Sequence, residues 1–300
     1  MIALAAVLSL SPLLQVAPPG PPQAPAKAAH VEWQRSLQDA LAVQKATGLP
    51  LLIAVNMDGE VFNERFAGET YQDARFVEWT RGYVCVVASP DRHTDRDHDS
   101  LGRRVECPRF PGCTCSEHIA IEPELFERYF GGTRNAPRHV GVGKDGKILF
   151  DRFLDASMQT AIDAIRTHKG TPKADAAVPT DGAALLARRD AAARRTLEQR
   201  YLAGDGAARR SLLTAAQQAG GEAFELVRLG LHDADDATFA VAAAALTKTG
   251  DRRAKAELED AVARIDDAAV RGALLARLAE IGRDDPATAR LVTNLSPSAT

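Results

Sequence analysis

Residues 51–89 read LLIAVNMDGEVFNERFAGETYQDARFVEWTRGYVCVVAS, and this stretch decides the fold. Its two ends, Leu51–Val55 and Tyr83–Ser89, are continuous apolar runs with several β-branched residues, a pattern typical of strands buried on both faces. Between them, Asp58 can cap a helix that continues with a break near Gly68. The stretch therefore predicts a buried strand, a helical segment and a second buried strand.

Further elements are expected on both sides of this stretch. Upstream, Trp33, Leu37 and Leu41 lie at helical spacing, and Gly48 marks the end of that helix. Downstream, two alternating apolar runs flank an Asp-Gly pair, which predicts a hairpin. The downstream elements are expected as a helix over 123–130, a hairpin over 139–153 and a last helix over 158–168.

The order of these elements resembles the thioredoxin fold over residues 31 to 170. The resemblance rests on the strand Leu51–Val55, which feeds a helix, and on Ala136-Pro137 just before the hairpin. In thioredoxin-like proteins this proline is cis and faces the start of the active-site helix. The resemblance thus implies a cis Pro137, a peptide-binding surface at Ala136 and Pro137, and an α/β thioredoxin-like domain over residues 30–170.

The redox motif of that family is absent where it is expected. Redox-active relatives carry Cys-x-x-Cys where the first core strand meets the next helix, because the positive end of the helix dipole lowers the pKa of a thiol. The matching positions fall on Glu60 and Asn63, and residues 56–67 contain no cysteine. We interpret Asp58 and Glu60 as helix-start residues. The surface between this helix start and Pro137 receives an extended peptide in relatives, so peptide binding without redox turnover is one hypothesis.

An insertion over residues 90–118 concentrates cysteine and histidine. It holds three of the chain's four cysteines and three of its seven histidines. The fourth cysteine, Cys85, lies in the second apolar run, where we interpret it as a small buried hydrophobe. Three hypotheses follow for the members of the cluster, which are His93, His98, Cys107, Cys113, Cys115 and His118.

The first hypothesis is a metal site. Thiolates and imidazoles are the donors that tetrahedral zinc prefers, and thiolates also accept copper(I). Either His93 or His98 could replace one ligand or lie behind the ligands. The expected Cys₃His set is Cys107, Cys113, Cys115 and His118.

The other two hypotheses use the same sulfur atoms differently. Export would favour a structural disulfide from Cys107 to Cys113 or Cys115, with the third thiol free or paired with Cys85. A Cys113–Cys115 bridge would be strained, and a strained bridge is an oxidising one. The third hypothesis is therefore thiol–disulfide exchange by Cys113 and Cys115, with His118 as a nearby base.

The N-terminus predicts export. Residues 1–17 carry no charged side chain, and their apolar part is too short for an ordinary membrane span. Its length suits a secretory signal peptide that is cleaved after Ala17. Residues 18–29, PPGPPQAPAKAA, predict an extended Pro-rich linker. We expect a periplasmic or extracellular protein with no transmembrane domain beyond the signal segment.

Residues 182–295 predict an all-α domain after a linker over 171–181. Apolar residues recur at spacings of three and four. Turn signals return about every thirty residues, at Asp205-Gly206, Asp235-Asp236 and Asp266-Asp267. This pattern resembles a short array of HEAT-like repeats, with a plain Ala-rich bundle as the alternative. Such arrays present a surface to protein partners. The formal net charge of −3 does not favour binding to nucleic acid.

These features predict a metal-binding or protein-binding module of the cell envelope rather than an enzyme. The alternative is a thiol–disulfide oxidoreductase or isomerase that uses the Cys113 and Cys115 pair. Zinc and copper are the metals that the cluster would accept.

Overall fold

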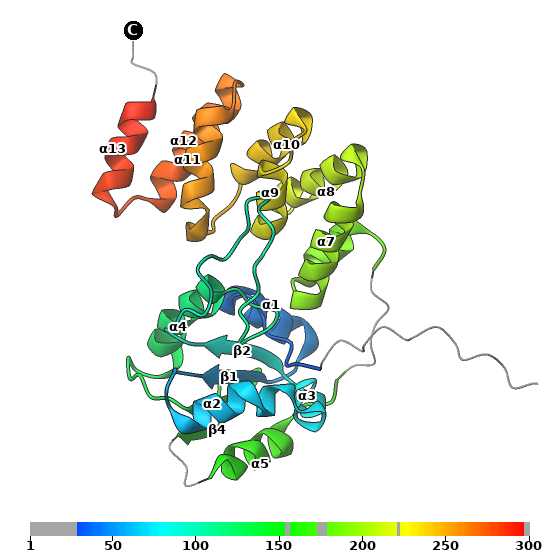
Figure 1. Ribbon diagram of the computed structural model, residues 1–300, viewed down its shortest axis with the longest axis vertical. Helices are drawn as coiled ribbons and strands as arrows, with labels where there is room; N and C mark the ends of the chain where they lie inside the picture. The colour runs from blue at the N-terminus through cyan, green and yellow to red at the C-terminus, as the bar shows by residue number, and fades with distance from the viewer. Residues whose placement is uncertain (1–28, 154–156, 173–178, 221–222, 297–300) are drawn as a thin grey trace, which may run out of the picture.

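The computed structural model describes residues 29–153, 157–172, 179–220 and 223–296. The expected signal peptide over 1–17 lies outside the described residues, as does the Pro-rich linker apart from its last residue. Most of the second expected linker lies outside them too. We refer to residues 29–172 as the sheet part and to residues 179–296 as the helical region (Figure 1).

A four-stranded sheet lies at the centre of the sheet part, with the strand order β2-β1-β3-β4. Strand β1 runs parallel to β2 and antiparallel to β3, which pairs antiparallel with β4. The two apolar runs form β1 and β2, and every residue of both strands is buried, as predicted. The strands are β1 (Leu51–Val55), β2 (Val84–Ala88), β3 (Arg138–Val142) and β4 (Ile148–Phe153).

Helices cover both faces of this sheet, because successive strand residues point to opposite sides. Leu51 and Ile53 belong to one apolar cluster, with α1 (Leu37–Thr47) and the body of α4 (Cys115–Tyr129). Leu52 contributes to a second cluster on the other face. The helices of that second face are α2 (Val61–Gly68), α3 (Ala74–Thr80) and α5 (Met158–His168), with the short 3₁₀ turn η1 (Thr70–Gln72) between the first two.

Two predicted details of the sheet part are confirmed. The hairpin connects β3 to β4 through the Asp-Gly turn. The peptide bond between Ala136 and Pro137 is cis, as the resemblance implied.

Helix α2 begins later than Asp58, so the prediction that Asp58 caps it was wrong. Glu60 is the residue before the helix, and its carboxylate accepts a hydrogen bond of 2.8 Å from the backbone N–H of Asn63. The interpretation of Glu60 as a helix-start residue is thus confirmed. Asp58 instead has a partner far along the chain, described below.

Helix α4 begins at Cys115, well before the predicted start at Pro123. The cause is a capping box, in which the Thr114 hydroxyl accepts from the backbone N–H of Glu117 and the Glu117 carboxylate accepts from that of Thr114. Pro123 lies inside the helix. The irregular part of the insertion therefore ends at Thr114.

The helical region consists of short helices that lie side by side (Figure 1). Aspartates begin most of them, and the predicted turn signals at Asp205, Asp235 and Asp267 are the N-caps of three. One apolar cluster runs through the region. The helices are α6 (Gly182–Arg188), α7 (Ala191–Ala203), α8 (Gly206–Gln218), α9 (Phe224–Leu231), α10 (Asp236–Leu246), η2 (Arg252–Ala254), α11 (Lys255–Arg264), α12 (Ala268–Ile281) and α13 (Pro286–Leu295).

The chain is thus a mixed α/β structure followed by a helical region. Across the described residues, no helix has the length and apolar character needed to cross a membrane.

Candidate metal centre

Four side chains of the insertion converge on one point. His93, Cys107, Cys115 and His118 each offer one donor atom, and these four atoms all lie within 4.8 Å of one another. The Nδ1 atom of His93 lies 3.3 Å from the Cys107 sulfur and 4.0 Å from the Cys115 sulfur. Around a tetrahedral zinc ion, donor atoms are about 3.4–3.8 Å apart, given usual bond lengths. The four residues, here named the Cys₂His₂ cluster, therefore need only small shifts to fit zinc.

Local structure explains why these four residues meet. Cys115 and His118 are three residues apart in the first turn of α4, so they lie on the same helix face. His93 follows the end of β2, the strand against which α4 packs. Cys107 is held close to the helix start because its backbone N–H donates to the carbonyl oxygen of Cys113 at 2.7 Å.

The ring of His118 has the protonation and orientation that a metal ligand needs. Its Nδ1 lies 3.1 Å from the carbonyl oxygen of Ser89, which can only accept, so Nδ1 carries the proton and Nε2 carries the lone pair. Nε2 is buried and has no hydrogen-bond partner among the described residues. Burial lowers the pKa of His118 to about 4, which keeps the ring neutral at pH 7. A buried lone pair without a donor is the feature expected of a metal ligand.

His93 is oriented by a carboxylate. Its Nε2 lies 3.0 Å from Oδ1 of Asp58, while its Nδ1 faces the two sulfur atoms. Asp58 is itself anchored, because its backbone N–H donates to Asp91 at 2.7 Å. Metal-binding histidines commonly have such a carboxylate on the other ring nitrogen, where it fixes the ring and makes it more basic. Asp58 was expected at a helix start, and its position in the structure is behind the cluster.

The two sulfur atoms lie in surroundings that suit bound thiolates. The Cys115 sulfur accepts hydrogen bonds of 3.2 Å from the His93 backbone N–H and from the Thr94 hydroxyl. It also lies at the N-terminus of α4, where the helix dipole favours negative charge. Burial, followed by the neighbouring Cys115, raises the pKa of Cys107 to about 12. At neutral pH this thiol therefore loses its proton only to a strong Lewis acid such as Zn²⁺.

Two residues of the predicted set lie outside the cluster. The Cys113 sulfur lies 3.8 Å from the carbonyl oxygen of Gln34, and burial raises the pKa of this thiol well above its usual value. His98 reaches Glu225 of helix α9, with 2.8 Å between Nε2 and Oε2. The expected Cys₃His set is thus replaced by Cys₂His₂, with His93 in place of Cys113.

All four cysteines lie within the described residues and are unpaired thiols. The geometry gives no pairing of Cys113 with Cys115, because their sulfur atoms contact different groups. At the predicted peptide-binding surface, Pro137 is buried and Ala136 packs against the core. Peptide binding there stays a prediction.

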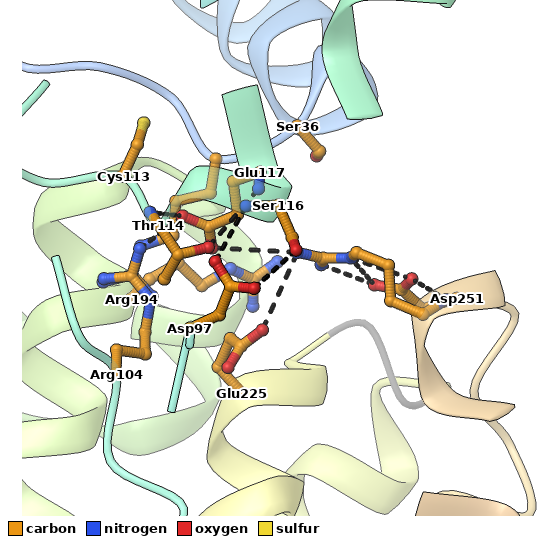
Figure 2. Close-up of polar contacts among 12 residues, drawn as sticks. Ser36, Asp97, Arg104, Cys113, Thr114, Ser116, Glu117, Arg194, Glu225 and Asp251 are labelled. Carbon is orange, nitrogen blue, oxygen red and sulfur yellow. Dashed lines mark hydrogen bonds and ion pairs between the residues drawn. The ribbon is translucent and has the colours of Figure 1, made fainter. Parts of the chain in front are cut away.

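A network of buried charges lies beside the cluster (Figure 2). Glu117, which lies between Cys115 and His118 in the sequence, is fully buried and forms an ion pair with Arg104. Its other oxygen lies 3.8 Å from Arg253 of η2, which also lies 3.7 Å from Glu225. Figure 2 shows Glu117, Glu225 and Asp251 turned toward the same region. The first turn of α4 thus contacts both the insertion and the helical region.

Asp97 fixes this turn of α4 from the insertion side (Figure 2). It accepts hydrogen bonds from the Ser116 backbone at 2.8 Å and the Ser116 hydroxyl at 2.5 Å. Arg92 donates to the same carboxylate at 2.7 Å. Burial alone would raise the pKa of Asp97, but the contacts with Ser116 and Arg92 outweigh it and lower the pKa to about 2. The carboxylate therefore stays charged at neutral pH and holds the helix start in place.

Comparisons with known proteins do not extend this description. No family model matches the chain, and neither a curated protein nor a solved structure matches it.

Proposed function

We propose that this chain is an exported protein of thioredoxin-like fold whose insertion binds one structural zinc ion. The ligands are His93, Cys107, Cys115 and His118. The observation that carries the proposal is the convergence of four donors, three of them on the buried residues Cys107, Cys115 and His118. The Nε2 atom of His118 has no other partner among the described residues.

Several features support the thioredoxin-like fold. The strand order β2-β1-β3-β4, with one parallel and two antiparallel pairings, agrees with the family, as does the cis bond before Pro137. Glu60 and Asn63 lie at the start of α2, the place at which redox-active relatives carry their cysteines. A carboxylate and an amide cannot exchange disulfides, so the proposed activity excludes redox turnover at this helix.

The donor chemistry favours zinc over copper(I). Two imidazoles and two thiolates form a common tetrahedral zinc set, whereas copper(I) is selected by sets richer in soft sulfur. The proposed role is structural because four protein donors fill a tetrahedron and leave no open position for a substrate. Cys115 and His118 are 0 % exposed, which also keeps substrates away.

The alternative function, thiol–disulfide exchange by Cys113 and Cys115, has less support. Cys113 is 0 % exposed, so an external disulfide cannot reach its sulfur. That sulfur contacts the carbonyl oxygen of Gln34 and lies outside the cluster that contains Cys115. In the helical region, the aspartate-capped helices and their continuous core support a HEAT-like array. A protein partner for that array stays a prediction.

The proposal is tested by the metal content of the purified full chain. Native mass spectrometry and elemental analysis should find one zinc per chain in the wild type. Cys107→Ser, Cys115→Ser and His118→Ala should each bind zinc so much more weakly that they lose it on dialysis against a chelator that leaves the wild type loaded.

Matched controls come from the residues that the structure leaves out of the cluster. Cys113→Ser and His98→Ala should keep one zinc per chain. A wild type without zinc after incubation with zinc salt would contradict the proposal, and so would ligand variants that bind as well as the controls.

A further inference from the structure

We propose that metal loading of the Cys₂His₂ cluster docks helix α9 of the helical region onto the sheet part, through the segment between the ligands His93 and Cys107. We name residues 94–106 the arm. This inference rests on the proposed zinc site and adds a role for it, namely control of the contact between the two parts of the chain.

The cluster holds both ends of the arm. His93 immediately precedes it and Cys107 immediately follows it, so one ion would bond to the chain at each end. Between these ends the arm folds back on itself, with a bridge between His98 and Arg104. A backbone hydrogen bond of 2.8 Å from the N–H of Val105 to the carbonyl oxygen of Asp97 joins the outgoing and returning halves of the arm. Fixing the two ends therefore fixes the direction in which the whole arm points.

The arm rises from the sheet part to α9 (Figure 1). Its first contact is the hydrogen bond of 2.8 Å between His98 and Glu225, which lies in the first turn of α9. Both side chains are largely buried there, and Arg228 also lies 3.4 Å from Glu225. The polar contact is thus part of the interface and not a loose surface pair.

The tip of the arm contacts the other end of α9. Gly102 has a φ of +71°, and a Cβ atom on it would lie 2.6 Å from the ring of His232 and 3.3 Å from the carbonyl oxygen of Arg228. His232 is the residue that follows the last turn of α9. Only glycine gives both this backbone conformation and this close approach, so the tip is fitted to the helix.

The ligands also reach the helical region by a second route. Glu117 lies between the ligands Cys115 and His118, and it joins Arg104 of the arm to Arg253 of η2. A buried carboxylate without its partners is costly, so the position of this helix turn and the position of η2 depend on each other. An ion that holds the first turn of α4 therefore favours the docked arrangement.

A separate contact does not involve the metal ligands. Arg35 forms an ion pair with Glu198 of α7, and Asp39 of α1 accepts a hydrogen bond of 2.7 Å from Arg189. A cavity of about 670 Å³ lies between this contact and the contact at α9, lined from both parts of the chain. Loss of the metal should thus leave the contact at α7 in place and release the arm from α9.

Hydrogen exchange measured by mass spectrometry on the full chain tests this inference. With zinc bound, amides of the arm and α9 should be protected, and removal of zinc with EDTA should speed their exchange at least about fivefold, the lower end of usual coupling between sites. Amides of α7 and α13 should change little. Equal exchange of α9 in zinc-loaded and metal-free protein would overturn the coupling and leave the zinc site intact.

A variant at the tip tests the same coupling in the opposite direction. Gly102→Ala keeps all four ligands but places a methyl group against His232. It should speed exchange of α9 in zinc-loaded protein and, by reciprocity, weaken zinc binding, by at most the factor with which zinc slows that exchange. The matched control is Gly146→Ala, which has a similar φ of +79° and no atom within 4 Å of the added Cβ. Equal results for the two variants would contradict the inference, whereas a chain that binds no zinc would overturn the proposed function itself.

Discussion

The starts of helices α2 and α4 lie near each other, although the two helices cover opposite faces of the sheet, and they differ in chemistry. Each helix has an N-terminus with unpaired backbone N–H groups and the positive end of a dipole. At α2 the capping side chain is the carboxylate of Glu60, and at α4 the first residue is Cys115 of the Cys₂His₂ cluster. Both helix starts are capped, by Glu60 and by Thr114, but only α4 places a sulfur donor in its first turn, so the residue beside the cap decides what chemistry the helix start can support.

The two helix starts are also connected. The carboxylate of Asp58, two residues before Glu60, accepts a hydrogen bond of 3.0 Å from Nε2 of His93 when Nδ1 of that ring faces the sulfur atoms of the cluster. The junction between β1 and α2 thus contacts the Cys₂His₂ cluster without contributing one of its four side chains. The predictions below separate the contributions of the two helix starts.

Removal of a ligand at the α4 start should have the largest effect. Structural zinc sites in small peptides bind with about 10–16 kcal/mol, so each of four ligands accounts for roughly 2.5–4 kcal/mol. Cys115→Ser should therefore weaken zinc binding by about two to three orders of magnitude, measured by competition with a chromophoric chelator. Glu60→Gln at the α2 start is the matched control and should bind zinc like the wild type.

A change of pH should alter zinc affinity nearly as much as the loss of a ligand does. Burial and the neighbouring Cys115 raise the pKa of Cys107 to about 12, so binding must displace its proton throughout the neutral range. Apparent affinity should rise at least about tenfold per pH unit between pH 6 and pH 8, because each displaced proton adds one such factor. Competition titrations at three pH values measure the slope, and a flat profile would show that Cys107 is not a ligand.

Asp58→Asn tests the connection between the two helix starts. The amide keeps the size of the side chain but removes the charge that orients His93, so zinc affinity should fall about 10- to 100-fold, as for other such partners of metal ligands. Secondary structure should be retained, which circular dichroism can verify. An unchanged affinity would mean that Asp58 has no part in the site.

Loss of the cap at the α2 start should have the smallest effect. Glu60→Ala removes the hydrogen bond to the Asn63 backbone and should lower the free energy of unfolding by about 1 kcal/mol, the usual cost of losing an N-cap. Urea denaturation of metal-free and zinc-loaded protein should show the same loss in both. A loss confined to the zinc-loaded protein would place Glu60 in the metal site instead.

Much of the sheet part was predictable because its signals are local. Leu51–Val55 is a continuous apolar run, and the Asp-Gly pair before Lys147 specifies a hairpin turn. The start of α4 was missed because Pro123 suggested a first helical turn, although Thr114 and Glu117 already show the spacing of a capping box.

The cluster was only partly predictable for the same reason. Cys113 and Cys115 are chemically identical, and only the position of Thr114 between them decides which one enters the helix beside His118. The contact between Asp58 and His93 joins residues 35 positions apart and leaves no periodic signal. Contacts of the arm with α9 depend in the same way on packing between distant segments, which no local pattern encodes.

The burial of the cluster has a further consequence for the valence of the proposed ion. Two thiolates neutralise a divalent ion, whereas a monovalent ion would leave the centre with one excess negative charge. That excess would lie among the buried side chains of Cys107, Cys115 and His118, and charge is costly where water is excluded. Burial of the cluster should therefore also discriminate between ions, and disfavour univalent copper even though sulfur attracts it.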